Sequence, residues 1–302
     1  MNHRLALAFT ALLLAAPAAW AEEAYLIKVK PEWKAGRRTQ VTETFTEDSR
    51  TALTDGTGKA VEETKESVEK STVMEETIIA LKAGTKRPEK LLMKFDKLKF
   101  KRNGEIVEHG LVGKTVVAEL QGEDFALSVE GGGKLTDEAN HILKEELRDE
   151  YLDEEYDFDR LYLSGKPVRI GETWACDIQA LAKVIEKQEG FKIDAAKAKG
   201  TGKLVKVSKK DGHTFGEFEI IVDLPVRQFT DLDGAEVKVH EGSKSKMLYS
   251  YVGCIDGSVD EGVMTISAEE MIKYDTQKMK GTTFQMSNKS KSVTERKEPP
   301  SK

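Results

Sequence analysis

Residue types that define several protein classes are scarce in this sequence of 302 residues. It contains two cysteines and three tryptophans, and aromatic residues account for only 7% of it. After residue 21, no apolar run approaches the ~20 residues that a membrane-spanning helix requires. Charged residues make up 33%, so we expect a solvated surface over a modest core, and no transmembrane segment.

Catalytic and cofactor-binding motifs are missing as well. After residue 21, the histidines at positions 109, 141, 213 and 240 lie far apart, without the HxH or HExxH spacing of metal sites. There is no GxSxG and no dinucleotide fingerprint, and the glycine run at 131–133 lacks the Lys-Ser/Thr of a phosphate loop. Because no nucleophile, base and orienting group can be assembled, we expect no enzyme activity, no metal and no cofactor.

The distribution of charge argues against one class of partner. The formal net charge is -6, and lysines and arginines are interspersed with acidic residues along the whole chain. Binding to phosphate backbones requires a concentrated basic face. We therefore expect no nucleic-acid partner.

The first 21 residues have the three parts of a secretory signal peptide. Arg4 supplies a positive charge, Leu5–Ala16 is an apolar run, and Ala19 and Ala21 are small residues at the positions that signal peptidase reads. No cysteine lies near this site to carry a lipid anchor. We expect cleavage before Glu22 and a periplasmic or extracellular product.

Alternating apolar and polar residues predict a mainly β fold. Every second residue from Phe218 to Val226 is apolar, and the same alternation recurs at 247–251, 264–266 and 284–286. Pro225 places that strand at an edge or at a bend. Tight hairpin turns are indicated by an Asn-Gly pair at 103–104 and by Asp-Gly pairs at 55–56, 211–212, 233–234 and 256–257.

The first half of the chain has similar patterns. We expect strands at 25–30, 38–47, 61–81, 91–101, 105–109, 114–120 and 125–130. A helix competes for 61–76, because Glu and Lys favour helices, but the Thr and Val content favours a strand.

Two helices are predicted between the strands. Leu135, Ile142 and Leu147 belong to one apolar stripe, and a shorter stripe begins at Ile178 with Asp177 as its N-cap. The fold class expected is therefore α+β, with long antiparallel strands in curved sheets or half-barrel-like lobes. Whether the halves form one sheet system or two lobes stays open. The expected segments are a signal peptide (1–21), a β-rich half (22–134), a helix with an acidic linker (135–160), a second β-rich half (161–295) and a disordered tail (296–302), with fraying from about residue 287.

An acidic run joins the two halves. Nine of the fifteen residues from Glu145 to Asp159 are Asp or Glu. Several carboxylates can bind Ca²⁺, but the run has neither the EF-hand spacing nor a glycine. A solvated helix end and linker is the favoured interpretation.

The two cysteines, Cys176 and Cys254, allow two interpretations. An even count and an oxidising destination are typical of a disulfide, which would close a loop of about 78 residues and stabilise the fold by a few kcal/mol. Two separate buried thiols are the alternative, because each cysteine lies beside strand-like sequence. Cysteine catalysis is disfavoured, since nothing local ties a histidine to either thiol.

The segment KPVRIGETWACDI, at 166–178, has the most distinctive residues. Pro167 fixes an extended start, Gly171 makes a turn, and Trp174 can bury a large apolar area, so these three are predicted to anchor the second half. The segment resembles a group of secreted bacterial β-rich proteins of uncharacterised function that have a Pro-Val-x-Val/Ile-Gly-Asp/Glu-x-Trp segment. GLVGKTVVAEL (110–120) and LVKVSKKDGHTFGEFEI (204–220) are similar to strands of that group. The resemblance implies a fold and an envelope location, and no catalytic residues.

Two functions are compatible with these observations. The first is binding of a lipid or other hydrophobic molecule on a concave sheet face, as in envelope lipid carriers. The second is a structural or protein-interaction module of the envelope with no small ligand. The residues predicted to line an apolar ligand face are Met247, Tyr249, Tyr251, Met264 and Met271.

Overall fold

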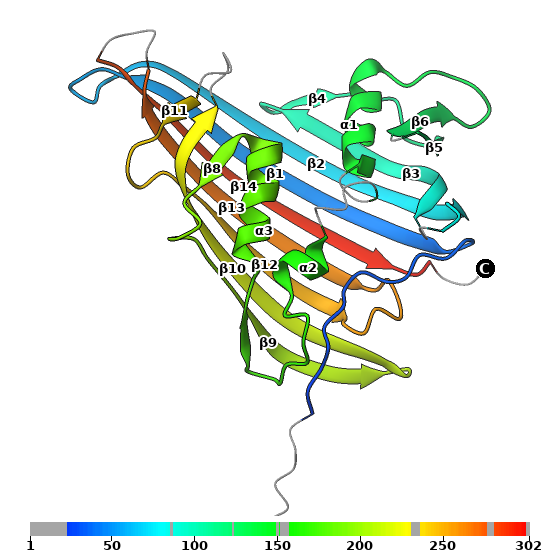
Figure 1. The fold of residues 1–302 in the computed structure, drawn as a ribbon. Coiled ribbons are helices and arrows are strands. Elements are labelled where there is room, and N and C mark those ends of the chain that lie inside the picture. Colours follow the sequence, from blue (N-terminus) through cyan, green and yellow to red (C-terminus); the bar gives the residue numbers. More distant parts are fainter. Residues whose placement is uncertain are drawn as a thin grey trace, which may run out of the picture.

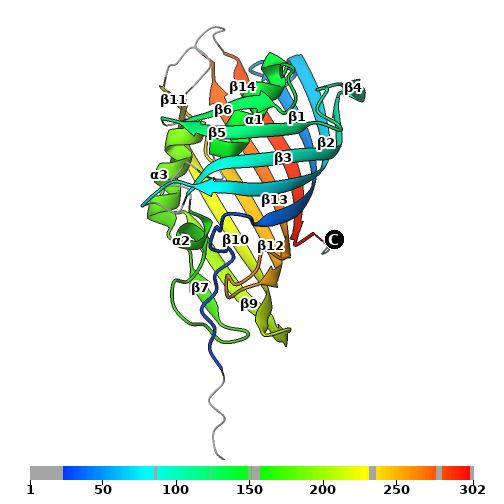
Figure 2. The same ribbon diagram turned by 90° about the vertical axis from the view of Figure 1, so that its right-hand side faces the viewer.

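The computed structural model describes residues 23–84, 87–122, 124–148, 151, 157–230, 236–276 and 281–299. In these residues the chain forms one antiparallel sheet of 14 strands that is not closed into a barrel, with three helices. The sheet is bent into a trough, and the helices lie on its concave side (Figures 1 and 2). The predicted fold class is confirmed.

The strands are long in the middle of the sheet and short at its ends. The first half contributes β1 (Arg38–Thr54), β2 (Ala60–Leu81), β3 (Pro88–Arg102), β4 (Glu105–Val107), β5 (Thr115–Gln121) and β6 (Asp124–Val129). The second half contributes β7 (Thr173–Ala175), β8 (Phe191–Ile193), β9 (Lys199–Lys210), β10 (His213–Thr230), β11 (Glu236–Lys238), β12 (Lys244–Cys254), β13 (Gly262–Asp275) and β14 (Thr283–Lys297). The competition between helix and strand at 61–76 is decided in favour of a strand.

The two halves share one sheet, which answers the question that the sequence left open. The strand order is β6-β5-β3-β2-β1-β14-β13-β12-β10-β9-β7, with β4, β8 and β11 attached beside it. β14 pairs with β1 along its whole length, from Thr54↔Thr283 to Gln40↔Lys297. The prediction that the tail frays from about residue 287 and is disordered from residue 296 is therefore wrong for the residues up to Lys297. Those residues form the central seam of the sheet, because both neighbours satisfy their backbone hydrogen bonds.

Alternation sets which face of each strand is buried. In β10, the side chains of Phe218, Ile220 and Val222 are almost completely buried on the concave side. Pro225 lies where the neighbour of β10 changes from β9, which pairs as far as Asp223, to β8. On that side the pairing is interrupted at Pro225, which suits a residue that has no backbone donor, while on the other side Pro225 still pairs with Lys244 of β12.

One β-bulge changes the phase of β3. The register with β2 shifts between Val73 and Met74, which leaves Asp96 as an extra residue. Phe95 before the bulge and Leu98 and Phe100 after it consequently all face the concave side. The run Leu91, Met93, Phe95, Leu98, Phe100 thus forms one continuous apolar face despite the change from odd to even positions.

Each helix begins at a side chain that caps it. Thr136 accepts a hydrogen bond from the Ala139 amide at the start of α1 (Asp137–Leu147), and Asp177 accepts one from the Ala180 amide at the start of α3 (Ile178–Glu189). The predicted cap at Asp177 is confirmed. A third helix, α2 (Phe158–Tyr162), was not predicted, because its five residues are too few for a periodic pattern.

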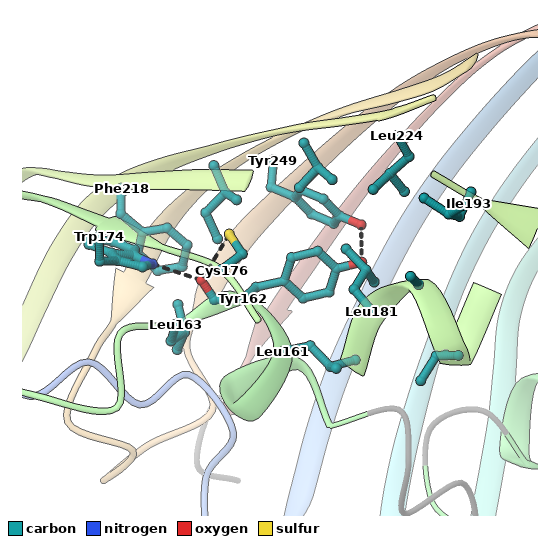
Figure 3. Close-up of a cluster of buried hydrophobic side chains, with 14 of the residues drawn as sticks. Leu161, Tyr162, Leu163, Trp174, Cys176, Leu181, Ile193, Phe218, Leu224 and Tyr249 are labelled. Atoms are coloured by element: carbon teal, nitrogen blue, oxygen red, sulfur yellow. Dashed lines mark hydrogen bonds between the residues drawn. The ribbon is translucent and has the colours of Figure 1, made fainter. Parts of the chain in front are cut away.

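The single sheet carries two separate cores. The N-terminal core lies between α1 and β2, β3, β5 and β6, and includes Leu91, Phe95 and Leu143. The C-terminal core lies between α2, α3 and strands β7–β13, and includes Tyr162, Leu181 and Phe218 (Figure 3). The concave floor between the two cores is formed mainly by β1, β13 and β14. Among the described residues, no helix is long and apolar enough to cross a membrane.

Candidate ligand-binding groove

A row of paired side chains crosses the concave floor from one core to the other. Starting in β10, the cross-strand neighbours are Phe218, Tyr251, Met264, Thr294, Glu43, Thr72 and Leu98. Neighbouring strands lie ~4.8 Å apart, so the row measures about 29 Å over its six steps. Its ends are apolar and its middle, at β14 and β1, is polar.

A segment at residues 25–37, here called the strap, runs over one end of this floor. The backbone of Tyr25 pairs with that of Val168, and the Lys28 amide donates to the Ile255 carbonyl at 2.8 Å. At the other end, the Gly36 amide donates to the Ile78 carbonyl at 2.8 Å. The expected strand at 25–30 is therefore reduced to isolated bridges. The strap connects the C-terminal core to the edge of the N-terminal core (Figure 1).

The strap and the floor enclose a groove of about 260 Å³. Its apolar walls come from Val29 and Trp33 of the strap, Phe158 of α2, and Tyr251 and Met264 of the floor. The remaining lining residues are Lys30, Pro31, Asp260, Gly262, Thr294 and Arg296. A concave, mostly apolar cleft with a few polar groups is the typical form of a small-molecule site.

The charged groups of the groove are paired with one another. Oδ2 of Asp260 lies 2.6 Å from Arg37, 3.4 Å from Arg296, and accepts a hydrogen bond from Thr39 at 3.1 Å. The Arg37 Nη2 contact is an ion pair without the angle of a hydrogen bond. The Lys30 ammonium lies 4.5 Å from the centre of the Trp33 ring, a cation–π distance. Each cation of the groove therefore already contacts a protein group: Asp260 for Arg37 and Arg296, and the Trp33 ring for Lys30.

Asp159 of α2 holds the strap from below. Its Oδ1 accepts a hydrogen bond from the Val29 amide at 3.4 Å. Burial raises the pKa of Asp159 to about 6, although the hydrogen bonds from the strap backbone oppose the change. This carboxyl is therefore half protonated near pH 6.

The five residues predicted to form a ligand face are distributed differently. Tyr251 and Met264 line the groove. Tyr249 is buried in the C-terminal core, where its hydroxyl bonds to that of Tyr162 at 2.9 Å (Figure 3). The Tyr249 hydroxyl also contacts the sulfur of Met247 at 3.2 Å. Met271 lies on the opposite, convex face, because it pairs with Lys244 of β12.

The two cysteines are separate free thiols, both buried. Cys176 follows β7 and its amide bonds to Gly200, whereas Cys254 ends β12. Three strand spacings separate β7 from β12, about 14 Å, and a disulfide needs Cα atoms within about 7 Å. The disulfide alternative is therefore wrong for this structure. Burial raises the pKa of the Cys176 thiol to about 11.

The segment around Trp174 packs against the C-terminal core. The Trp174 indole N–H donates to the Tyr162 carbonyl at 2.7 Å, and the ring covers Gly202 so closely that a Cβ there would lie 2.1 Å from it (Figure 3). Gly171 makes the turn with φ +82°. Pro167 is exposed, and the residues after it form a single bridge at Val168 rather than a strand.

The acidic run lies partly outside the described residues, at 149–150 and 152–156. Within the parts that the structure describes, no group of three or more His, Cys, Asp or Glu side chains is placed to hold a metal ion. The predicted signal peptide at 1–21 also lies outside the described residues.

Sequence reasoning missed the residues that close the groove. Trp33 and Val29 lie in a strap without alternation, and Phe158 lies inside the acidic run. The one sequence feature that could have indicated these residues is an isolated aromatic side chain within charged sequence. It occurs at Trp33, shortly after Pro31, and again at Phe158. Neither signal says which surface the ring will cover.

Comparisons with known proteins give distant similarities only. No protein-family model and no curated protein sequence matches the chain. A solved structure described as lipid-protein interactions in lipovitellin is 11% identical with a TM-score of 0.35, covering 91% of this chain and 26% of its own. The attachment invasion locus protein Ail of Yersinia pestis is 4% identical with a TM-score of 0.14, covering 86% and 99%. OpdQ of Pseudomonas aeruginosa is 8% identical with a TM-score of 0.18, covering 86% and 98%. The chain thus spans about a quarter of the lipovitellin chain.

Proposed function

We propose that the protein is a non-enzymatic binding protein of the periplasm or the extracellular space, which holds a hydrophobic small molecule in the groove beneath the strap. The observation that carries the proposal is the groove itself, with apolar walls from Trp33, Phe158 and Met264 on a concave floor. The signal-like sequence at 1–21 supports the location.

The position of the groove favours a ligand over ordinary packing. Both cores are closed by their own helices, whereas the floor at the groove is covered by the strap and by the Phe158 side chain at the start of α2. Ile27 anchors the start of the strap in the C-terminal core. The part beyond it is held by a few backbone bonds and by Asp159, so we expect this part to open at a lower free-energy cost than either core. A hydrophobic molecule would gain by covering the apolar walls, at ~25 cal/mol per Å² of buried apolar area.

The test compares two neighbouring residues of β13. Met264 lies in the groove, whereas Val263 lies on the convex face and is 37% exposed. We expect the apolar dye 1-N-phenylnaphthylamine to bind the 22–302 protein with increased emission. Met264→Arg should weaken this binding at least tenfold, and Val263→Arg should leave it within twofold. Urea unfolding of each variant verifies that it is folded.

Equal dye affinity for both variants would refute the groove as the binding site, and so would the absence of dye binding by the folded protein. Native mass spectrometry of protein purified gently from its own envelope then identifies the class of the natural ligand. A clean apo mass would favour the alternative, a protein-interaction module.

A further inference from the structure

A second, smaller pocket lies beneath α1 at the other side of the floor. It is here called the α1 pocket, and its volume is about 50 Å³. Apolar residues of β2, β3 and α1 form most of its wall, and its polar residues are Glu43, Lys70, Thr72, His109 and Glu146. Since a benzene-sized molecule needs roughly 150 Å³, the pocket has room for a polar group and not for a whole ligand.

Two buried polar side chains in this pocket have no hydrogen-bond partner among the described residues. They are Thr72, through its hydroxyl, and His109, through both ring nitrogens. Thr72 is 3% exposed and His109 is 7% exposed. Leaving such buried groups unpaired is destabilising, and the side chains of their neighbours Phe95 and Leu98 offer no donor or acceptor. A partner that both donates and accepts would remove this cost.

The charge of the α1 pocket decides which polar group fits. Lys70 is the ammonium in the lining, and its Nζ lies 2.9 Å from Glu43 and also contacts Glu146. Burial lowers the pKa of Lys70, but the carboxylates of Glu146 and Glu43 together raise it by more than burial lowers it. The pKa of Lys70 is therefore raised above its usual value. Two carboxylates therefore outweigh one ammonium among the described lining residues, so a ligand carboxylate or phosphate would be repelled.

The α1 pocket and the groove meet at the middle of the floor. Thr294 lines the groove and pairs directly with Glu43, which lines the α1 pocket. From Met264 to Thr72 the floor row takes three steps, about 14 Å at ~4.8 Å per strand. A single extended, chain-like molecule can cover that span.

We infer that the ligand is a neutral amphipathic molecule, whose hydroxyl or amide end binds Thr72 and His109 in the α1 pocket while its apolar chain lies in the groove. This inference rests on the proposed function, since it assigns the polar end of the molecule that the groove holds. The polar end is assigned to the α1 pocket rather than to the groove, because Arg37 and Arg296 both already contact Asp260, whereas Thr72 and His109 have no hydrogen-bond partner among the described residues.

The experiment is competition against 1-N-phenylnaphthylamine by 1-decanol and by decanoate at pH 8. Decanol should displace the dye at least tenfold more effectively than decanoate. Thr72→Val and His109→Phe should each weaken decanol about tenfold, the equivalent of one hydrogen bond, without changing dye affinity. Thr44→Val is the matched control, because Thr44 is an exposed threonine of β1 on the convex side; it should change neither.

The outcomes separate the two proposals. The inference is overturned if decanoate displaces the dye as well as decanol does. It is also overturned if decanol competes undiminished with the dye in folded Thr72→Val protein. In either case, Met264→Arg still tests the groove independently. If the dye does not bind at all, both proposals fail. Thr72→Val keeps the side-chain shape, so the test does not depend on His109→Phe folding.

Discussion

Replacing Asp159 by asparagine should stabilise the protein at high pH and hardly at low pH. The pKa of this carboxyl rises from 3.8 to about 6 on folding, chiefly through burial. Its contribution to stability is therefore fully present below pH 3.8 and is lost as the pH rises through 6. A shift of about 2 units corresponds to roughly 3 kcal/mol at 1.36 kcal/mol per unit.

Asparagine has no charge to desolvate, and its Oδ1 can still accept the hydrogen bond from the Val29 amide. Urea unfolding of the wild type and of Asp159→Asn, at pH 4.5 and at pH 8, gives the free energy of unfolding for each. We expect the variant to gain ~2–3 kcal/mol at pH 8 and about 1 kcal/mol at pH 4.5. A gain that is equal at both values would show that Asp159 is not a buried ionised group.

Three further predictions concern the fold. Gly202→Ala should destabilise the protein by ~1–3 kcal/mol, because the new Cβ would overlap the indole ring above it, while Gly56→Ala, with its nearest atom at 3.8 Å, should be close to neutral in the same urea titration. Cys176 and Cys254 should both be alkylated by iodoacetamide after denaturation without reductant, and a mass two daltons low with no label would contradict the free thiols. Deletion from Ser287 onward should abolish cooperative unfolding, because β1 and β13 lose their common partner; a cooperative transition in the truncated chain would contradict that role.

The sequence predicted those features that depend on local pattern. Alternation in 218–226 identified the buried face of β10, and the capping side chain of Asp177 marked the start of α3. The dipeptide at 103–104 identified a hairpin, and Asn103 has the expected positive φ of 52°. Each of these outcomes is set by residues within a few positions of one another.

The local sequence pattern could not predict which distant strands pair with each other. The alternation around 284–286 predicted a strand there, but the charged and serine-rich residues after Ser287 have no apolar face and looked like a tail. They are ordered because both of their neighbours are long strands of the same sheet. Met271 was assigned to the ligand face by residue type, although its odd position in β13 places it opposite Met264 and Ile272.

The pairing of β1 with β14 also governs when the protein can complete its fold. Val41 and Arg296 are direct partners across this seam, although 254 residues lie between them. Contacts of such sequence separation form late, since a large loop must close before the pairing is rewarded. Each half can collapse around its own helices first, but the floor on which both pockets depend is continuous only after the last strand has arrived. Until then β1 and β13 have unpaired edges open to other chains, so a chain emerging from N- to C-terminus needs protection from aggregation until its final fifteen-residue strand is available.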